Sequence, residues 1–327
     1  MPKDNSVNEI RVAAAARLHL GFLDLNGGLG RKFGGLGLSI DGPATRLTLT
    51  RAEATSVEGP EAARAKPLLA QAVAAFAPGV HYALRLRETI PAHAGLGSGT
   101  QLALAMAAAV RRMENVAGDS RRDAAAMGRG ARSGLGAGLF EDGGFVVDGG
   151  RSPEGPTAPI VARLPFPRDW RILLVFDESD KGLHGEDERE AFAALPKFSD
   201  GAAGDLCRHV LMQALPAIVD RDFAGFGAAI AHVQRIVGDY FAPAQGGRRF
   251  VSPGVELAIA RLLADGAVGG GQTSWGPTGF AFCGSEAEAE RLLRRHGEKA
   301  REEGLRLEVV RALERGAKVD AVFARMA

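Results

Sequence analysis

A short loop with three glycines and a serine, residues 95–99 (GLGSG), stands directly before a run of apolar residues. Leu102, Met106 and Ala109 recur there at helical spacing, so the loop is expected at a helix N-terminus. The first N–H groups of a helix lack intrahelical partners, and the helix dipole adds a partial positive charge at the same point. Ser98 either caps this helix or offers its hydroxyl to a phosphate. The pattern predicts an anion site that is neither a Walker loop nor a dinucleotide fingerprint; the alternative is a capped helix with a glycine turn.

Glycine is the unusual component of the composition, with 44 of 327 residues. It gathers in clusters within residues 27–37, 95–99, 128–150 and 266–279, and ordinary amphipathic sequence separates them. Glycine is needed where φ is positive or where the backbone approaches a ligand closely, and successive free N–H groups can hold an anion. The clusters therefore predict loops that face a ligand or, as the simpler alternative, tight turns without one.

The segments between the glycine clusters alternate between strand and helix patterns. Strands are expected at 44–53, 82–90 and 171–177, and helices at 61–76, 121–132, 186–195, 206–219, 223–237, 255–264 and 286–303. A proline-rich segment, residues 152–167, divides the chain near its middle. We therefore expect an α+β fold with α/β-like alternation and two domains, residues 1–160 and 161–327.

The charge balance gives no reason to expect a polyanionic partner. The 40 lysines and arginines almost cancel the 39 aspartates and glutamates, so neither nucleic acid nor an anionic membrane is indicated. The apolar run near the N-terminus is too short for a secretory signal, and no window approaches the ~18 apolar residues of a membrane span. Cys207 and Cys283 belong to no metal or redox spacing. We expect a cytoplasmic protein that acts on small molecules.

The glycine loop also resembles a known motif. Pro91-xxx-Gly95-Leu96-Gly97-Ser98 is similar to the phosphate-binding motif of the GHMP superfamily, which includes galactokinase, homoserine kinase and mevalonate kinase. A strand and glycine turn at 16–41 and the glycine-rich loop at 266–279 complete the order of three motifs, so the resemblance covers essentially the whole chain. It implies a two-domain GHMP-kinase-like fold, with a ribosomal-S5-domain-2-like N-terminal domain carrying the phosphate loop and a ferredoxin-like C-terminal domain.

Two positions depart from the kinase pattern. Gly99 stands where kinases of this superfamily usually have a second serine that helps to hold magnesium, and Thr100 is the nearest hydroxyl. Gly136 stands where many members have an aspartate that serves as catalytic base. Phosphoryl transfer depends on positioning, metal and charge neutralisation, and a carboxylate commonly accepts the hydroxyl proton. The departures argue against a kinase, although Glu141 or Asp142 could replace the missing base.

A branch of the superfamily without kinase activity, the β-ribofuranosylaminobenzene 5′-phosphate synthase family, resembles the chain closely. Similar segments lie at 16–41, 129–150, 182–192, 238–247 and 271–280. The resemblance implies a pentosyltransferase of tetrahydromethanopterin biosynthesis. It would join 5-phosphoribosyl 1-pyrophosphate to the ring carbon of 4-aminobenzoate or 4-hydroxybenzoate and release CO2 and pyrophosphate. No enzymic nucleophile is required, so catalysis is expected to depend on positioning, leaving-group neutralisation and exclusion of water.

On this resemblance, the candidate residues for the donor are charged or lie in the glycine loops. Its phosphates are assigned to Gly95, Gly97, Ser98, Gly99 and Thr100, and neutralisation of pyrophosphate to Arg17, His19, Arg31 and Lys32. Asp24 and Asp41 are candidates for magnesium or the ribose hydroxyls, and His184 for a proton donor or phosphate ligand. Catalytic roles are thus considered for Arg17, His19, Asp24 and His184. The alternatives are solvated charges, turn chemistry and a surface histidine.

The candidates for the aromatic acid lie near the C-terminal glycine loop. They are Gln272, Thr273, Ser274, Trp275, Tyr240, Phe241 and Gln245, and ordinary packing is the alternative for the aromatic residues. Arg248 and Arg249 are weaker candidates, because a firm ion pair would resist loss of the carboxylate as CO2. Mg²⁺ is expected with the pyrophosphate, with no ligand set indicated, and the resemblance suggests a homodimer. A small-molecule kinase and a binding protein without activity remain the alternative functions.

Overall fold

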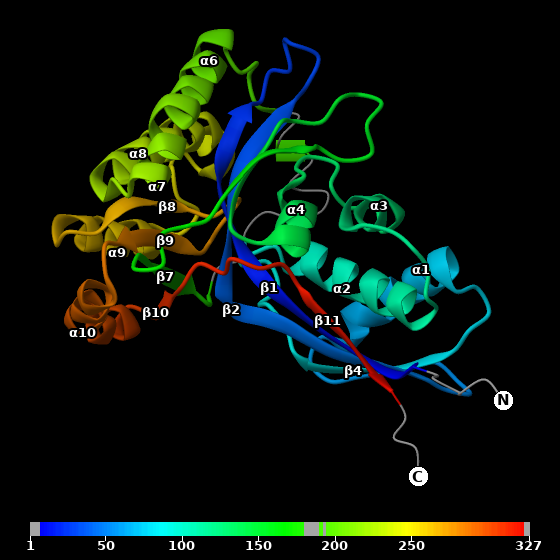
Figure 1. Cartoon of the computed structure of the whole chain (residues 1–327). Coiled ribbons are helices and arrows are strands. Elements are labelled where there is room, and N and C mark those ends of the chain that lie inside the picture. Colours follow the sequence, from blue (N-terminus) through cyan, green and yellow to red (C-terminus); the bar gives the residue numbers. More distant parts are fainter. Residues whose placement is uncertain (1–6, 180–189, 192–193, 324–327) are drawn as a thin grey trace.

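The computed structural model describes residues 7–179, 190–191 and 194–323, which form two sheets flanked by helices (Figure 1). The strands are β1 (Val7–Asp24), β2 (Phe33–Arg51), β3 (Ser56–Glu58), β4 (Tyr82–Glu88), β5 (Phe145–Asp148), β6 (Ile160–Leu164), β7 (Arg171–Asp177), β8 (Val268–Gln272), β9 (Gly279–Cys283), β10 (Leu305–Val310) and β11 (Lys318–Phe323). The first sheet has the order β11-β1-β2-β4-β3, with β5 paired to β2 and β6 paired to β5. The second sheet has the order β10-β7-β9-β8.

The helices fall into an N-terminal and a C-terminal group. The first contains α1 (Ala62–Phe76), α2 (Ser98–Met113), α3 (Ser120–Ala126) and α4 (Leu135–Asp142). The second contains α6 (Asp200–His209), α7 (Leu215–Asp220), α8 (Phe223–Phe241), α9 (Pro253–Ala264) and α10 (Glu286–Glu302). Side-chain oxygens of Asp222, Ser252 and Ser285 cap α8, α9 and α10 by accepting hydrogen bonds from first-turn N–H groups. No helix among the described residues is long and apolar enough to cross a membrane.

The long hairpin of β1 and β2 joins the two cores of the molecule (Figure 1). In its first half, Ile10 and Val12 are buried with apolar residues of α1 and α2. In its second half, Leu18 and Leu20 are buried with residues of β7, α8 and β9. The register of the hairpin shifts between Ala15 and Arg17 and again between His19 and Gly21. Because such irregularities redirect side chains, the change from one core to the other places chemistry-bearing residues at the boundary.

The sheets do not separate at the predicted domain boundary. β6 continues the first sheet to Leu164, beyond residue 160, and β11 returns from the C-terminal end of the chain to pair with β1. The strand predicted at 44–53 is the end of the longer β2, and the strands predicted at 82–90 and 171–177 correspond to β4 and β7. The α+β class is confirmed.

The helix predictions are correct for α1, α8, α9 and α10 within a few residues. The helix predicted at 121–132 is wrong in its second half, because α3 ends at Ala126 and Gly128 and Gly130 adopt φ angles of 62° and 83°. Where one helix was predicted at 206–219, α6, a π-helical turn and α7 follow one another from Asp200 to Asp220. Most of the helix predicted at 186–195 lies outside the described residues.

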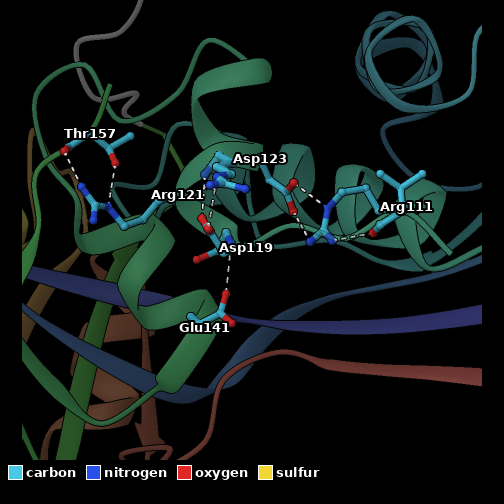
Figure 2. A network of polar contacts seen from close by, with 9 residues as sticks. Arg111, Asp119, Arg121, Asp123, Glu141 and Thr157 are labelled. Carbon is cyan, nitrogen blue, oxygen red and sulfur yellow. Dashed lines mark hydrogen bonds and ion pairs between the residues drawn. The ribbon is translucent and has the colours of Figure 1, made fainter. Parts of the chain in front are cut away.

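A network of buried polar contacts fixes α3 against α2 and α4 (Figure 2). Arg111 binds both carboxylate oxygens of the almost fully buried Asp123, at 2.6 and 2.7 Å. Glu141, near the end of α4, accepts a hydrogen bond from the backbone N–H of Ser120 at 3.0 Å. The chain that follows α3, residues 127–134, is therefore held on a rigid support.

Candidate active site

The three glycine motifs meet at one carbonyl group. The carbonyl oxygen of Gly95 accepts hydrogen bonds from Arg17 Nη1 at 2.6 Å and from Thr273 Oγ1 at 3.0 Å. The same threonine hydroxyl accepts a hydrogen bond from the backbone N–H of His19 at 2.9 Å. These bonds tie β1, the loop before α2 and the loop after β8 together across large sequence separations.

The loop before α2 presents a helix N-terminus, as predicted, but its capping differs from the prediction. Gly97 is the N-cap residue, with φ 81°, and no side chain caps the helix, because Ser98 is already the first helical residue. The hydroxyl of Ser98 instead accepts a hydrogen bond from Arg64 Nη2 at 3.1 Å. The first N–H groups of α2 therefore remain available to an anion, with a guanidinium group beside them.

A cavity of about 210 Å³, the larger of two chambers in this region, lies beside this helix N-terminus. Arg17, Arg129 and Arg132 line it, together with Thr100 of α2. The start of α4 faces the same space through Gly136 and its neighbours. None of the described residues that line the cavity is an aspartate or a glutamate. Two helix N-termini and three guanidinium groups thus converge on one space, which is suited to a ligand with more than one anionic group.

Arg129 is partly buried at the cavity. Burial, followed by repulsion from Arg64, lowers the pKa of its guanidinium below the ordinary value. Its Nε atom is buried and has no hydrogen-bond partner within the described ranges. A buried N–H group without a partner is costly, so an anion in the cavity that accepts from Nε would relieve this cost when it binds.

A buried carboxylate supports the wall of the cavity from behind. Asp148 of β5 is fully buried and accepts hydrogen bonds from Ser133 Oγ at 2.8 Å and from the backbone N–H of Gly134 at 3.0 Å. Its second oxygen accepts from the N–H of Gly150 at 3.0 Å. Burial raises the pKa of Asp148, while the hydrogen bonds from Ser133 and the backbone oppose the rise. Asp148 therefore fixes the turn that begins α4, without reaching the cavity itself.

A second, smaller chamber adjoins the first and has an aromatic wall. Phe22, Phe241 and Trp275 line it, and the ring centroids of Phe241 and Trp275 are 4.6 Å apart. Its polar lining includes Gln245 and Gln272, whose side-chain amides are joined by a hydrogen bond of 2.9 Å. The free volume is only about 20 Å³, close to that of one water molecule. A benzoate ring would therefore enter only if side chains of this wall move.

His19 stands where the two chambers meet, since it lines both of them together with Phe22 and Ser274. Burial, and then the charges of Arg17 and Arg132, lower the pKa of His19 to about 3, so the imidazole is neutral at neutral pH. Its Nδ1 accepts a hydrogen bond from the N–H of Gly21, which leaves the proton on Nε2. Nε2 is buried and has no partner in the part of the chain that is described. His19 is thus arranged to donate one hydrogen bond to a ligand at the junction.

Several predicted site residues lie together at these chambers. The structure places Arg17, His19 and Thr100 at the larger chamber and Gln245, Gln272 and Trp275 at the smaller one. Ser274 borders both, Gly95 and Thr273 form the link between the motifs, and Gly97, Ser98 and Gly99 form the start of α2. Their roles toward a substrate remain predictions.

Other candidates lie away from both chambers. Asp24 accepts hydrogen bonds from the N–H groups of Asn26 and Gly27, as in ordinary turn chemistry, and Asp41 accepts one from the N–H of Arg311. Three more candidates also lie outside the lining of both chambers. Arg31 donates a hydrogen bond to the Gly150 carbonyl, Lys32 lies over the Phe33 ring, and Tyr240 donates to the Pro196 carbonyl.

The remaining candidates are explained by pairing or by their position in the chain. Arg249 borders the smaller chamber but is paired with Asp239, at 2.5 Å, and Arg248 lies 3.6 Å from Glu256. The candidate proton donor His184 lies outside the described residues.

The sequence analysis named Arg17 but missed two other cations of the larger chamber, Arg129 and Arg132. Arg129 and Arg132 lie within the glycine cluster at 128–150, and two arginines spaced by three among glycines were the available signal. Arg64 belongs to an amphipathic helix, and nothing in its spacing distinguished it from a solvated charge. Phe22 continues the apolar alternation of β1, which made it an ordinary core residue in the sequence.

Comparisons with known proteins identify the family of the chain. Family models described as "GHMP kinases N terminal domain" and "GHMP kinases C terminal" match residues 62–140 and 214–302. A homoserine kinase from Cytophaga hutchinsonii has a similar structure, with a TM-score of 0.66 and 16% identity, covering 96% of this chain and 98% of that one. The fold and the glycine-loop site thus define a protein of the GHMP superfamily.

The curated relatives identify the branch. A β-ribofuranosylphenol 5′-phosphate synthase from Archaeoglobus fulgidus is 32% identical over 95% of this chain and 99% of its own length. The protein of the same name from Methanothermobacter thermautotrophicus is 30% identical over 84% of this chain and 89% of its own length. The chain therefore belongs to the β-ribofuranosylphenol 5′-phosphate synthase family of enzymes.

Proposed function

We propose that this protein is a decarboxylating pentosyltransferase that joins 5-phosphoribosyl 1-pyrophosphate to a para-substituted benzoate and releases CO2 and pyrophosphate. The observation that carries the proposal is the junction at His19, where an arginine-lined chamber opens beside an aromatic one. A donor with two phosphate-bearing ends suits the first chamber, and an aromatic acceptor suits the second. On this proposal, the product enters tetrahydromethanopterin biosynthesis.

The arginine-lined chamber supports departure of the pyrophosphate. The first turns of α2 and α4 border this chamber at Thr100 and Gly136, and Arg17, Arg129 and Arg132 supply positive charge. As the bond between the ribose C1 and the pyrophosphate oxygen breaks, its electron pair leaves with the oxygen, and the developing negative charge meets cations that are already in place. Such preorganised charge lowers the barrier without reorganisation during the reaction.

The acceptor then completes the reaction without a nucleophile from the protein. The ring carbon that bears the carboxylate attacks the electron-poor ribose C1 and forms the new carbon–carbon bond. The bond from this ring carbon to the carboxylate breaks, CO2 leaves, and the electron pair returns to the ring and restores its aromaticity. No proton has to be removed from the attacked carbon, which is consistent with the neutral state of the nearby imidazole of His19.

The smaller chamber supports recognition of the acceptor ring. Phe22, Phe241 and Trp275 offer faces and edges for ring contacts, and Gln245 and Gln272 offer polar atoms at its wall. The para substituent, a hydroxyl or an amine, selects between two acceptors that the sequence left open. Because the relatives are named for a phenol product, we favour 4-hydroxybenzoate as the acceptor of this chain.

Magnesium fits this site only as a companion of the donor. Mg²⁺ prefers carboxylate oxygens among protein ligands, and among the described residues no carboxylate lines the larger chamber. The hydroxyls of Thr100 and Ser133 are present there, but they do not make a magnesium site by themselves. We therefore propose that Mg²⁺ enters as part of the pyrophosphate complex. The homodimer and the cytoplasmic location also remain proposals, which light scattering and cell fractionation would test.

The structure disfavours a kinase for a specific reason. Glu141, the first substitute for the missing catalytic base, lies near the C-terminal end of α4 (Figure 2), where it accepts a hydrogen bond from the backbone N–H of Ser120. Neither Glu141 nor Asp142 lines the chamber. A small-molecule kinase of this superfamily would need a carboxylate near the transferred phosphate.

The test is release of labelled CO2 from carboxyl-labelled 4-hydroxybenzoate and 4-aminobenzoate, each with phosphoribosyl pyrophosphate and magnesium. Release that depends on the phosphoribosyl donor is expected, and it should be faster with the hydroxybenzoate. Binding of both substrates without release would indicate a protein that only binds them. Consumption of ATP with small alcohols and no CO2 release would establish the kinase instead.

A further inference from the structure

A group of three metal-ligating side chains lies away from both chambers, between α6 and α8. Asp205 and His209 are four residues apart on α6, and His232 lies on α8. Each offers one ligand atom, and these atoms lie within 4.8 Å of one another. The two imidazole rings are stacked, with centroids 3.8 Å apart and planes inclined by 22°. All three side chains are partly exposed, so the group is open to solvent on one side.

We propose that Asp205, His209 and His232 bind one divalent transition-metal ion of the zinc type, which links α6 to α8. Two imidazoles and one carboxylate are a donor set suited to Zn²⁺, with a fourth position left for water. Imidazole donors distinguish this site from the pyrophosphate complex of magnesium, because Mg²⁺ prefers oxygen ligands. The role that follows is structural, since the site lies outside the two chambers.

The protonation pattern of His209 already suits a metal ligand. Its Nδ1 lies 3.0 Å from the backbone carbonyl oxygen of Asp205 and 3.3 Å from Oδ1 of the Asp205 carboxylate, and both acceptors require Nδ1 to carry the proton. Nε2 is then the unprotonated nitrogen. A ring N–H that donates to a carbonyl is the usual outer contact of a metal-bound histidine, because it fixes both the tautomer and the orientation of the ring.

His232 has to rearrange before a metal binds. Its Nε2 lies 2.5 Å from Asp205 Oδ2, whereas two ligands of a tetrahedral zinc lie roughly 3.4 Å apart when the bonds are ~2.0–2.1 Å long. Arg235 donates to Nδ1 of His232 at 3.2 Å, which places the ring proton on Nε2. A metal at Nε2 therefore requires the proton to move to Nδ1 and Arg235 to turn away.

The surrounding charge also bears on the choice of metal. Arg208 lies near the Asp205 carboxylate, and Arg235 contacts the His232 imidazole. Their positive charges would repel a cation that is held only by charge attraction. The Asp205 carboxylate lies beside both imidazoles, 2.5 Å from His232 Nε2 and 3.3 Å from His209 Nδ1, so it is placed to serve as a ligand. Bonding to imidazole nitrogen, rather than net charge, must supply the affinity, which favours Zn²⁺, Co²⁺ or Ni²⁺ over Mg²⁺.

The link would stiffen a helix that carries part of the proposed acceptor chamber. His232 lies two residues before Gln234, and both Gln234 and Phe241 of α8 line that chamber. The other end of α6 contacts the tip of the β1–β2 hairpin, where Asn26 Nδ2 donates to Asp200. A metal between α6 and α8 would thus join the hairpin tip, through α6, to the wall of the chamber.

The experiment measures binding of Zn²⁺ by calorimetry and of Co²⁺ by visible absorption, in the full chain without substrates and after removal of any histidine tag. We expect one ion per chain, at least ~10-fold weaker binding in His209→Ala and in His232→Ala, and a raised melting temperature with saturating Zn²⁺. Arg235→Gln should bind more tightly than the wild type, because it removes both the competing hydrogen bond and a positive charge.

The matched control is His296→Ala. His296 lies 2.7 Å from Asp265 in a similar histidine–aspartate pair that lacks a second histidine, so its loss should leave metal binding unchanged. Circular dichroism would establish that each variant is folded, and His209→Gln provides a milder change at the same position. Absence of stoichiometric binding by the wild type would overturn the proposal. So would equal affinity in the wild type and in both folded histidine variants.

Discussion

Replacing Gly95 by alanine tests whether the junction of the three glycine motifs supports both folding and activity. Gly95 has φ 73°, a conformation that side chains disfavour, and a Cβ atom built there would lie 2.3 Å from the carbonyl oxygen of Thr273. The neighbour is backbone and cannot simply rotate away. The loop before α2 and the loop after β8 would have to move apart, and the hydrogen bond from Thr273 Oγ1 to the Gly95 carbonyl would be strained.

The expected cost has two parts that a control variant separates. An alanine forced into the left-handed region costs roughly 1–2 kcal/mol, and overpacking costs typically about 1–3 kcal/mol more, so Gly95→Ala should lose about 2–5 kcal/mol of unfolding free energy. Gly79 has φ 85°, and a Cβ atom added there would have no neighbouring atom within 4 Å, so Gly79→Ala carries only the first part. The change in unfolded-chain entropy is the same in both variants and cancels from their difference.

The assay combines urea unfolding with donor-dependent CO2 release at a temperature where both variants are folded. Gly95→Ala should have the lower unfolding midpoint and should lose activity beyond its unfolded fraction, because the helix N-terminus and Arg17 are displaced together. Gly79→Ala should keep nearly full activity. Equal midpoints in the two variants, with wild-type activity in Gly95→Ala, would show that the contact at the junction does not carry the structure or the site.

Three further predictions concern charged groups. The pKa of His19 is about 3 in the folded chain and about 6.5 in the unfolded chain, so the unfolded chain binds more protons between these two pH values. The contribution of His19 to the free energy of unfolding should therefore be full above pH 6.5 and fall toward pH 3. In urea unfolding, this fall should be shallower in His19→Gln, by up to ~1.4 kcal/mol per pH unit. Arg129→Met should raise KM for the phosphoribosyl donor about tenfold or more, whereas Arg294→Met, at an exposed position of α10, should not change the kinetics. Arg111→Met should cost about 3–5 kcal/mol in thermal or urea unfolding by leaving Asp123 buried without its partner, and adding Asp123→Asn should restore part of the loss; an unchanged midpoint would contradict the account of this network.

The order of residues along the chain was enough to predict features that depend only on neighbouring residues, such as the start of a helix. The glycine loop followed by an apolar helical repeat predicted a helix N-terminus at residues 95–99, and α2 begins there, at Ser98. Of the two roles left open for Ser98, capping is excluded, because Gly97 takes the left-handed conformation and becomes the N-cap. One positive φ, which the sequence allowed but did not require, decided which residue caps the helix.

The sequence could not predict how distant segments share one space. β1 pairs with β11, from the other end of the chain, and no periodicity records such a pairing. Arg17 and Arg129 come from different elements and meet only because the hairpin and the turn before α4 border the same chamber. Asp24, in contrast, lies in a motif of the right chemical type, yet its carboxylate is occupied by the N–H groups of its own turn.

One departure from the kinase pattern, Gly136, is tied to the packing of Thr100. A Cβ atom built on Gly136 would lie 2.6 Å from the Cγ2 methyl of Thr100, so that methyl group fills the space where an aspartate side chain would begin. Restoring the carboxylate would therefore require Thr100 to move as well, and Thr100 lines the chamber that the arginines surround. The packing of Thr100 thus excludes an aspartate base at position 136, and the charged side chains that line the chamber among the described residues are cationic. Such a chamber can stabilise a departing pyrophosphate but offers no carboxylate to accept the proton of an attacking hydroxyl.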